Sequence, residues 1–203
     1  MNRISTTLML FIAISTPAVA ADQGYFAYGD WGIFSLSGAP VKSLDGIRIG
    51  GGYDFNPYVG VEAGLFIISD LLTKNNNSDS IRFSPYTDES MSISSDQVAV
   101  VGTIPLDHHR DLVGKLGWAT TTLDYQYSHY GSGIQTVTGS GSATKTNPMF
   151  GIAWKSAPDQ HVRFIVQYEN LGKIKMTASY SDQSSSTYDI KVEIISVGIL
   201  YDF

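Results

Sequence analysis

The C-terminal segment, residues 189–203, constrains the fold more than any other part of the sequence. Counting back from the last residue, every second side chain is apolar: Phe203, Tyr201, Ile199, Val197 and Ile195. A period of two indicates a β-strand with one apolar face. The segment is longer than the usual strand of about five or six residues in a soluble protein. Its length fits a tilted strand that crosses a bilayer, which needs roughly nine to eleven residues.

The N-terminus predicts a secretory signal peptide. A positive charge near the start is followed by an apolar run over residues 8–14, and then by Ala18 and Ala20, the small residues of a cleavage site. This apolar run is too short for a membrane anchor. We therefore expect a cleaved signal peptide over residues 1–20 and a single mature domain over residues 21–203.

The charge and the cysteine content exclude several classes of protein. Without Arg3, which lies in the signal peptide, 12 Lys and Arg stand against 19 Asp and Glu, a net charge of −7. This balance argues against a nucleic-acid partner. There is no cysteine, so neither disulfides nor a lipid on an N-terminal cysteine are expected. An exported chain without cysteine suits the envelope of a Gram-negative bacterium.

The rest of the mature chain predicts seven further strands. We expect strands over residues 24–36, 44–55, 58–69, 96–104, 112–125, 147–155, 161–171 and 189–203. The longer, polar connections follow every odd strand, as in bacterial barrels with long outer loops and short periplasmic turns. An even number of strands lets the first pair with the last, which removes open edges. The pattern predicts an all-β, eight-stranded, antiparallel up-and-down transmembrane β-barrel in the outer membrane, with both termini periplasmic.

The two faces of these strands predict which side chains point inward. In residues 44–55, Ile47 and Ile49 share one face, and Arg48 and Gly50 share the other. Glycine with isolated charges is the wrong filling for an apolar core, so we expect this face to line a narrow polar interior. The opposite assignment, an apolar core with the charges in water, conflicts with the signal peptide and the C-terminal strand.

Five charged side chains form the predicted interior network. They are Arg48, Glu62, Lys115 and Arg163, with Asp30 as a possible fifth member. A lone buried charge is unfavourable, so we expect these groups to pair. Such a network either gates a narrow ion path or plugs the lumen. The plug is favoured, because about eight strands leave barely enough room for side chains.

Two stretches resemble a known family. Residues 52–64 (GYDFNPYVGVEAG), and residues 101–106 taken with 112–118, resemble strand pairs of the outer-membrane protein A type of small β-barrel. The resemblance extends loosely to residues 163–169 and to Phe203. It implies an eight-stranded transmembrane barrel with a charge-paired interior. Barrels of this kind stabilise the envelope, adhere to surfaces or modify lipid.

Aromatic residues are expected in two belts at the membrane interfaces. The periplasmic belt contains Tyr53, Phe55, Tyr58, Tyr201 and Phe203, and the outer belt contains Phe66, Tyr125 and Tyr168. Trp118 and Trp154 are expected on the lipid face nearer mid-depth.

Catalytic and metal chemistry find little support. The four histidines, at positions 108, 109, 129 and 161, lack the spacing and the third ligand of a zinc site. A lipid-hydrolysing site would need Ser128 and His129 side by side, with Glu169 or Glu193 as the acid. Adjacent residues of a strand point to opposite faces, so this pair does not meet directly. We expect no enzyme activity, no metal and no cofactor.

The predicted function is structural or interactive. Polar loops over residues 70–95, 128–145 and 173–188 are expected to meet a host or surface ligand, in adhesion or in support of envelope integrity. Other expected partners are outer-membrane lipid, lipopolysaccharide and the barrel-assembly machinery. The last of these would recognise the terminal strand through Phe203, Tyr201, Ile199 and Val197. The alternatives are an enzyme that modifies lipid A and a narrow ion pore.

Overall fold

The chain folds into eight long strands. The structure, a computed structural model, describes residues 24–39, 43–67, 86–107, 109–131, 134–156 and 161–203. The strands are β1 Gly24–Ser37, β2 Ser43–Asn56, β3 Val59–Ile67, β4 Tyr86–Asp107, β5 Arg110–Gly131, β6 Ile134–Ser156, β7 Val162–Tyr180 and β8 Ser185–Asp202. Within these ranges, no helix is long and apolar enough to cross a membrane. The predicted signal peptide, residues 1–20, lies outside them and stays a prediction.

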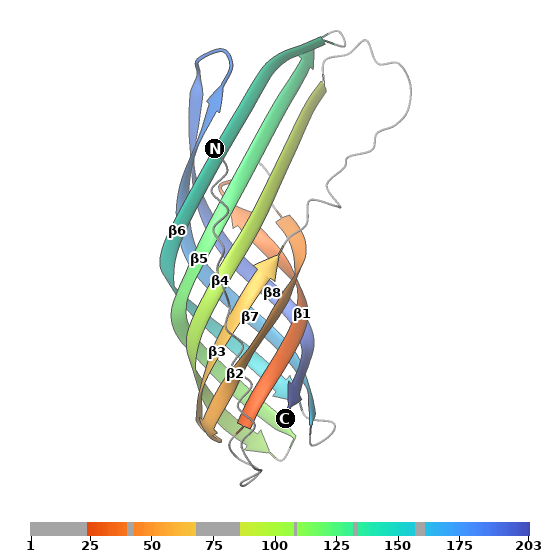
Figure 1. Ribbon diagram of the computed structural model, residues 1–203, viewed down its shortest axis with the longest axis vertical. Helices are drawn as coiled ribbons and strands as arrows, with labels where there is room; N and C mark the ends of the chain where they lie inside the picture. Colours follow the sequence, from red (N-terminus) through yellow and green to blue (C-terminus); the bar gives the residue numbers. More distant parts are fainter. Residues whose placement is uncertain (1–23, 40–42, 68–85, 108, 132–133, 157–160) are drawn as a thin grey trace, which may run out of the picture.

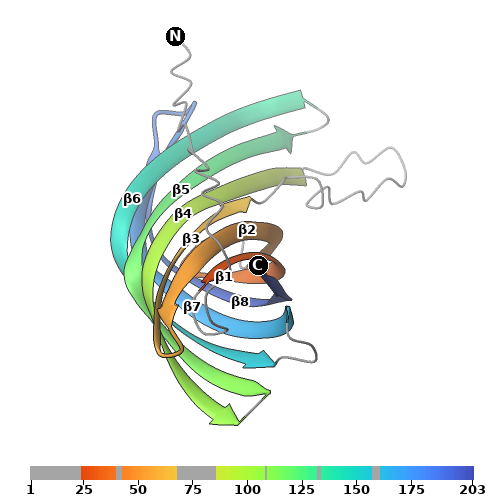
Figure 2. The same cartoon turned by 60° about the horizontal axis from the view of Figure 1, so that its bottom comes forward.

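The strands form one closed ring. Each strand pairs antiparallel with the next, and β1 closes the ring by pairing with β8 from Phe26↔Asp202 to Ser37↔Lys191. Figures 1 and 2 show this up-and-down order around the barrel. Closure gives both edge strands a partner, so the ring has no open edge along β1 and β8. The predicted eight-stranded antiparallel barrel is confirmed.

A continuous apolar band covers the outside of the lower barrel. On β8 the outward side chains Ile195, Val197, Ile199 and Tyr201 are each about half exposed or more. The same parity on the other strands exposes Trp31, Ile47, Ile49, Val98, Val100, Leu116, Trp118, Phe150, Ile152, Phe164 and Val166. Residues 195–203, at a rise of about 3.3 Å and a tilt of about 40°, span roughly 20–25 Å of height, which matches the apolar band of outer-membrane barrels.

The strands continue above this band, where the sequence predicted loops. β4 begins at Tyr86 instead of residue 96, β6 begins at Ile134 instead of 147, and β7 runs on to Tyr180 instead of 171. Residues 86–95, 134–145 and 173–180 of the predicted loops are therefore strand, and there the loop predictions were wrong. Residues 70–85 lie outside the described residues, so the loop stays a prediction for them. In Figure 1 the long strands β4, β5 and β6 rise together beyond the end of β3. We call the part of the barrel above the apolar band the extension.

In the extension the polarity of the two faces is reversed. The outward side chains are hydroxyl-rich, and Thr120 bonds Thr146 (2.8 Å) while Thr122 bonds Thr144 (2.9 Å) across β5 and β6. The inward side chains form an apolar core of Phe34, Leu36, Leu44, Phe66, Met91, Ile93, Ala119, Leu123, Tyr125, Met149, Leu171, Ile174, Met176, Ala178, Ile190, Val192 and Ile194. Here the prediction of a polar interior is wrong, because water outside favours an apolar core inside.

The predicted aromatic belts are only partly correct. Phe66 and Tyr125 were expected on the outer belt, yet both are buried in the apolar core, where the Phe66 ring packs edge-on against Phe34 at 4.3 Å. Tyr168 does face outward. At the lower rim, exposed rings include Phe55, Tyr58, Tyr201 and Phe203.

Short turns join the strands at the lower end. The Asn56 side chain accepts bonds from the backbone N–H groups of Tyr58 and Val59. In the β4–β5 turn the Asp107 carboxylate accepts from Arg110 Nε at 2.7 Å and from the His109 N–H at 2.9 Å. These bonds favour the charged form and lower the pKa of Asp107 below its ordinary value. Side-chain bonds of this kind satisfy backbone N–H groups within these two turns.

The apolar band predicts where a new charge is tolerated. Ile199→Arg places a charge inside the band and is expected to lower the free energy of unfolding in lipid vesicles by about 2–4 kcal/mol. The control, Thr187→Arg, places the same charge on the outer face of the extension and is expected to change it by less than about 0.5 kcal/mol. Urea unfolding of both refolded variants tests this. Equal losses would contradict the assignment of the band.

Candidate functional site

The candidate site is a charge network inside the barrel, level with the apolar band. Strand alternation points Asp30, Arg48, Glu62 and Lys115 inward, and all four are buried. Arg48 and Lys115 are almost completely enclosed, at 0% and 1% exposure. Buried cations need partners, and each has several.

Arg48 of β2 is one centre of the network. Its Nε donates to Asp30 Oδ2 at 2.9 Å, and its Nη1 donates to Glu169 Oε2 at 2.8 Å and to Gln97 Oε1 at 3.1 Å. The guanidinium also lies 5.0 Å from the centre of the Tyr28 ring. One side chain thus connects β1, β2, β4 and β7.

Lys115 of β5 is the second centre. Its Nζ donates to Glu62 Oε1 and to Gln167 Oε1, both at 2.6 Å, and lies 3.3 Å from Glu169 Oε1. Glu169 therefore joins the two cations into one network. Gln167 extends it by donating to Asp30 Oδ2.

Glycine makes room for these long side chains. A Cβ at Gly151 of β6 would lie 2.9 Å from the Glu169 Cγ, too close for an ordinary contact. The glycines that the sequence places on the inward face thus leave space for charged and aromatic side chains across the lumen.

The structure separates Arg163 from the other predicted members. Its Nε donates to Asp202 Oδ2 at 2.6 Å and its Nη1 lies 3.7 Å from Asp111, near the lower rim. It is partly exposed and contacts neither Arg48 nor Lys115 in the described residues. Close to the rim, Lys155 is buried with its Nζ 5.3 Å from the centre of the Phe26 ring.

Sequence reasoning missed several members of the network. Glu169 and Gln167 were placed on the same face of their strand as Arg163, but neither they nor Gln97 were selected for the network. Lys155, buried nearer the rim, was not selected either. The signal was present, because Gln167 and Glu169 share the parity of Arg163 in their strand. Distances between strands decide which of these inward residues meet, and those depend on register.

The residues of the enzyme alternative do not come together. In register with β6, Ser128 pairs with Thr138, whereas Glu169 pairs with Gly151. Thirteen residues along β6 correspond to roughly 40 Å. Glu193 is engaged outside the barrel, where it accepts bonds from Tyr168 and Lys191. Across the described ranges, no group of three or more His, Cys, Asp or Glu side chains is placed to hold a metal.

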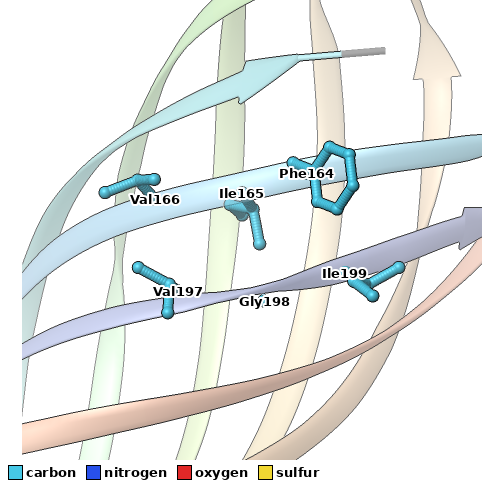
Figure 3. A pocket seen from close by; sticks show the side chains of 6 residues that line it. All are labelled: Phe164, Ile165, Val166, Val197, Gly198 and Ile199. Carbon is cyan, nitrogen blue, oxygen red and sulfur yellow. The ribbon is translucent and has the colours of Figure 1, made fainter. Parts of the chain in front are cut away.

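The outer wall carries a shallow apolar groove of about 320 Å³ between β7 and β8. Phe164, Ile165, Val166, Val197, Gly198 and Ile199 line it, as Figure 3 shows. Ile165 and Gly198 have the inward parity, so the groove lies between the outward side chains of Phe164, Val166, Val197 and Ile199. The groove lies within the apolar band and contains no ionisable side chain.

The terminal strand presents its alternate side chains outward. Val197, Ile199 and Tyr201 are 49%, 52% and 47% exposed, and Phe203 is 76% exposed. The Phe203 N–H donates to the Tyr25 carbonyl at 3.0 Å, which fixes the end of the chain to β1.

Comparison with known proteins places this architecture in a family. A model of the outer membrane protein beta-barrel domain matches residues 5–203. No curated protein matches the sequence. Among solved structures, Ail, the attachment invasion locus protein of Yersinia pestis, is 16% identical with a TM-score of 0.53, covering 89% of this chain and 99% of Ail.

Two further structures share the fold. Neisserial surface protein A is 13% identical with a TM-score of 0.53 and covers 89% of this chain and 97% of its own. A major outer membrane protein from Thermus thermophilus is 11% identical with a TM-score of 0.61 and covers 89% and 99%. At such identities the likeness concerns the fold alone. With the family match over residues 5–203, the chain belongs to the outer membrane protein beta-barrel domain family.

Proposed function

We propose that this protein is a non-enzymatic outer-membrane barrel with a closed lumen, whose extension is a surface for contacts outside the cell. The observation that carries the proposal is the reversal of polarity above the apolar band. A barrel that only needed to cross the membrane would not require an additional water-facing, apolar-cored portion. Recognition commonly resides on segments held by such a scaffold.

Two groups of side chains, one above the other, fill the lumen and support its closure. The Arg48–Lys115 network occupies the interior at the level of the membrane, and its cations are almost completely buried. Above it, the apolar core of the extension packs Phe34 against Phe66 with no exposed surface on either ring. An ion would have to pass both fillings.

The orientation and the partners follow the same proposal. The long strand pairs extend to the outside of the cell. The short turns lie on the periplasmic side, together with the start of β1 and the end of β8, as in bacterial barrels. Outer-membrane lipid surrounds the band, and the assembly machinery recognises the terminal strand ending at Phe203. The name of Ail, an attachment invasion locus protein, supports adhesion as the first role to test.

Attachment of whole cells tests the surface role. A Gram-negative host displaying the protein is expected to attach to epithelial monolayers more than the same host without it. Thr122→Glu/Thr144→Glu on the β5–β6 face and Thr177→Glu/Thr187→Glu on the β7–β8 face alter two outer surfaces, and at least one is expected to reduce attachment. Arg110→Ser, in the opposite turn, is the control. Unchanged attachment with and without the protein, and unchanged detergent sensitivity of the envelope, would contradict the proposal.

Planar bilayers test the closed lumen. The refolded protein is expected to give no stepwise conductance, because both the network and the apolar core fill the interior. Glu62→Gln removes one charge from the network and is expected to remain silent. Conductance steps whose size changes in Glu62→Gln would instead support the narrow pore.

Unfolding measurements test the network itself. Arg48→Met leaves the carboxylates of Asp30 and Glu169 without their main cation and is expected to lower the free energy of unfolding by about 3–5 kcal/mol. Arg163→Met is the matched control, and its partly exposed ion pairs predict a loss of about 1 kcal/mol or less. The measurement is urea unfolding in vesicles, and similar losses for the two variants would show that the network is not a centre of stability.

A further inference from the structure

The basic side chains outside the barrel are gathered on one side. Apart from Arg110 in a lower turn, the outward-facing lysines and arginines of the described residues lie on β7 and β8 above the apolar band: Lys173, Lys175 and Lys191. Lys145 of β6 has the parity of the inward side chains, but it is exposed where the pairing of β6 with β7 is interrupted. Outward acidic side chains lie on both sides: Asp45, Asp96 and Asp124 on the other strands, and Asp189 and Glu193 beside the lysines on β8. We call the four lysines the lysine patch.

Neighbouring strands place two of these lysines directly opposite one another. Lys173 of β7 pairs in register with Lys191 of β8. Like charges at such positions are destabilising unless an anion lies nearby. Lys191 has Glu193 at 2.9 Å, and Lys175 lies opposite Asp189 without an ion pair within 4 Å. Lys173, whose direct partner is Lys191, is exposed and forms no ion pair with the described residues.

The structure holds the patch in place. Lys145 Nζ and Asn147 Nδ2 both donate to the Lys173 carbonyl, at 2.9 and 3.2 Å. These bonds tie β6 to β7 where the regular pairing is interrupted between Ser140/Phe150. Because they reach the main chain of Lys173, its ammonium group stays available.

The apolar groove lies farther down β7 and β8, the strands that carry Lys173, Lys175 and Lys191. Going down β8 from Lys191, Glu193 marks the top of the band, and Val197 and Gly198 line the groove. Lys191 and Val197 are separated by roughly 20 Å along the strand. Cationic groups above an apolar groove match a molecule that has an anionic head group and a hydrocarbon tail.

We propose that the lysine patch and the groove bind one phosphorylated glycolipid of the outer leaflet, the lipid anchor of lipopolysaccharide. Its phosphates contact Lys173 and Lys175, which act as point charges. One of its acyl chains lies in the groove of Figure 3 between Phe164 and Val197. The inference rests on the outward orientation proposed above, but not on the closed lumen or on adhesion.

Binding of lipid A to the refolded full chain in detergent micelles tests this proposal. The probes are bis-phosphorylated lipid A and the same lipid with both phosphates removed, counted by native mass spectrometry. The wild-type protein is expected to prefer the phosphorylated form at least about tenfold, in line with two charge-assisted contacts. Lack of any preference in the wild type overturns the proposal without any variant.

Variants assign the preference to the patch. Lys173→Ser/Lys175→Ser is expected to bind both lipids equally, Lys173→Arg/Lys175→Arg to keep the preference, and Arg110→Ser, which removes a distant charge, to keep it as well. A preference that persists in the double serine variant overturns the site. Heat-modifiable gel migration verifies that each variant is folded.

Two further arms distinguish the source of the anion and the orientation. Inorganic phosphate or a sulfated polysaccharide that displaces bis-phosphorylated lipid A at low concentration would show a general anion site and overturn the lipid assignment. Labelling of Ser185→Cys on intact cells reports orientation separately. If Ser185→Cys is labelled and the wild-type protein shows no preference for phosphorylated lipid A, this inference alone is refuted. If Ser185→Cys is not labelled, the proposed orientation is refuted.

Discussion

Closure of the ladder between β1 and β8 is the constraint on which the rest of the structure depends. Hydrocarbon offers no hydrogen-bond partner, so every backbone N–H and C=O inside the apolar band must be paired within the protein. A ring meets this requirement, and it forces alternate side chains into a narrow lumen. The apolar face is then free to meet lipid, and the other face must be filled by whatever the strands carry inward.

The protein fills its interior in two ways, each matched to what lies outside. Within the band, long polar side chains cross the lumen and satisfy one another through Glu169, which joins Arg48 to Lys115, and small apolar clusters pack beside them. In the extension, water surrounds the barrel and the interior is an ordinary apolar core. The interior changes from charged to apolar near the height at which the outer face changes from apolar to hydroxyl-rich. Both changes mark the top of the apolar band.

The same boundary organises the outer surface. Below it the wall offers an apolar groove over Gly198, and above it β7 and β8 carry lysines at facing positions. A phosphorylated lipid would use both at once, while the hydroxyl-rich faces farther out remain available for contacts with other molecules. Lipid anchoring and outward recognition would then occupy different heights on the same strands.

The sequence by itself determined the eight-stranded ring and the apolar band, because the alternation of apolar and polar residues is a local pattern. The residues next to Ile47 and Val197 are enough to show which face of the strand each side chain belongs to. The sequence also determined that Arg48, Glu62 and Lys115 point inward. Only the tertiary structure decided that residues 86–95 and 134–146 are strand, since serine and threonine facing water are found in loops and strands alike. It also decided that Glu169 joins the network while Arg163 does not, because the depth at which two side chains meet depends on the register and tilt of distant strands.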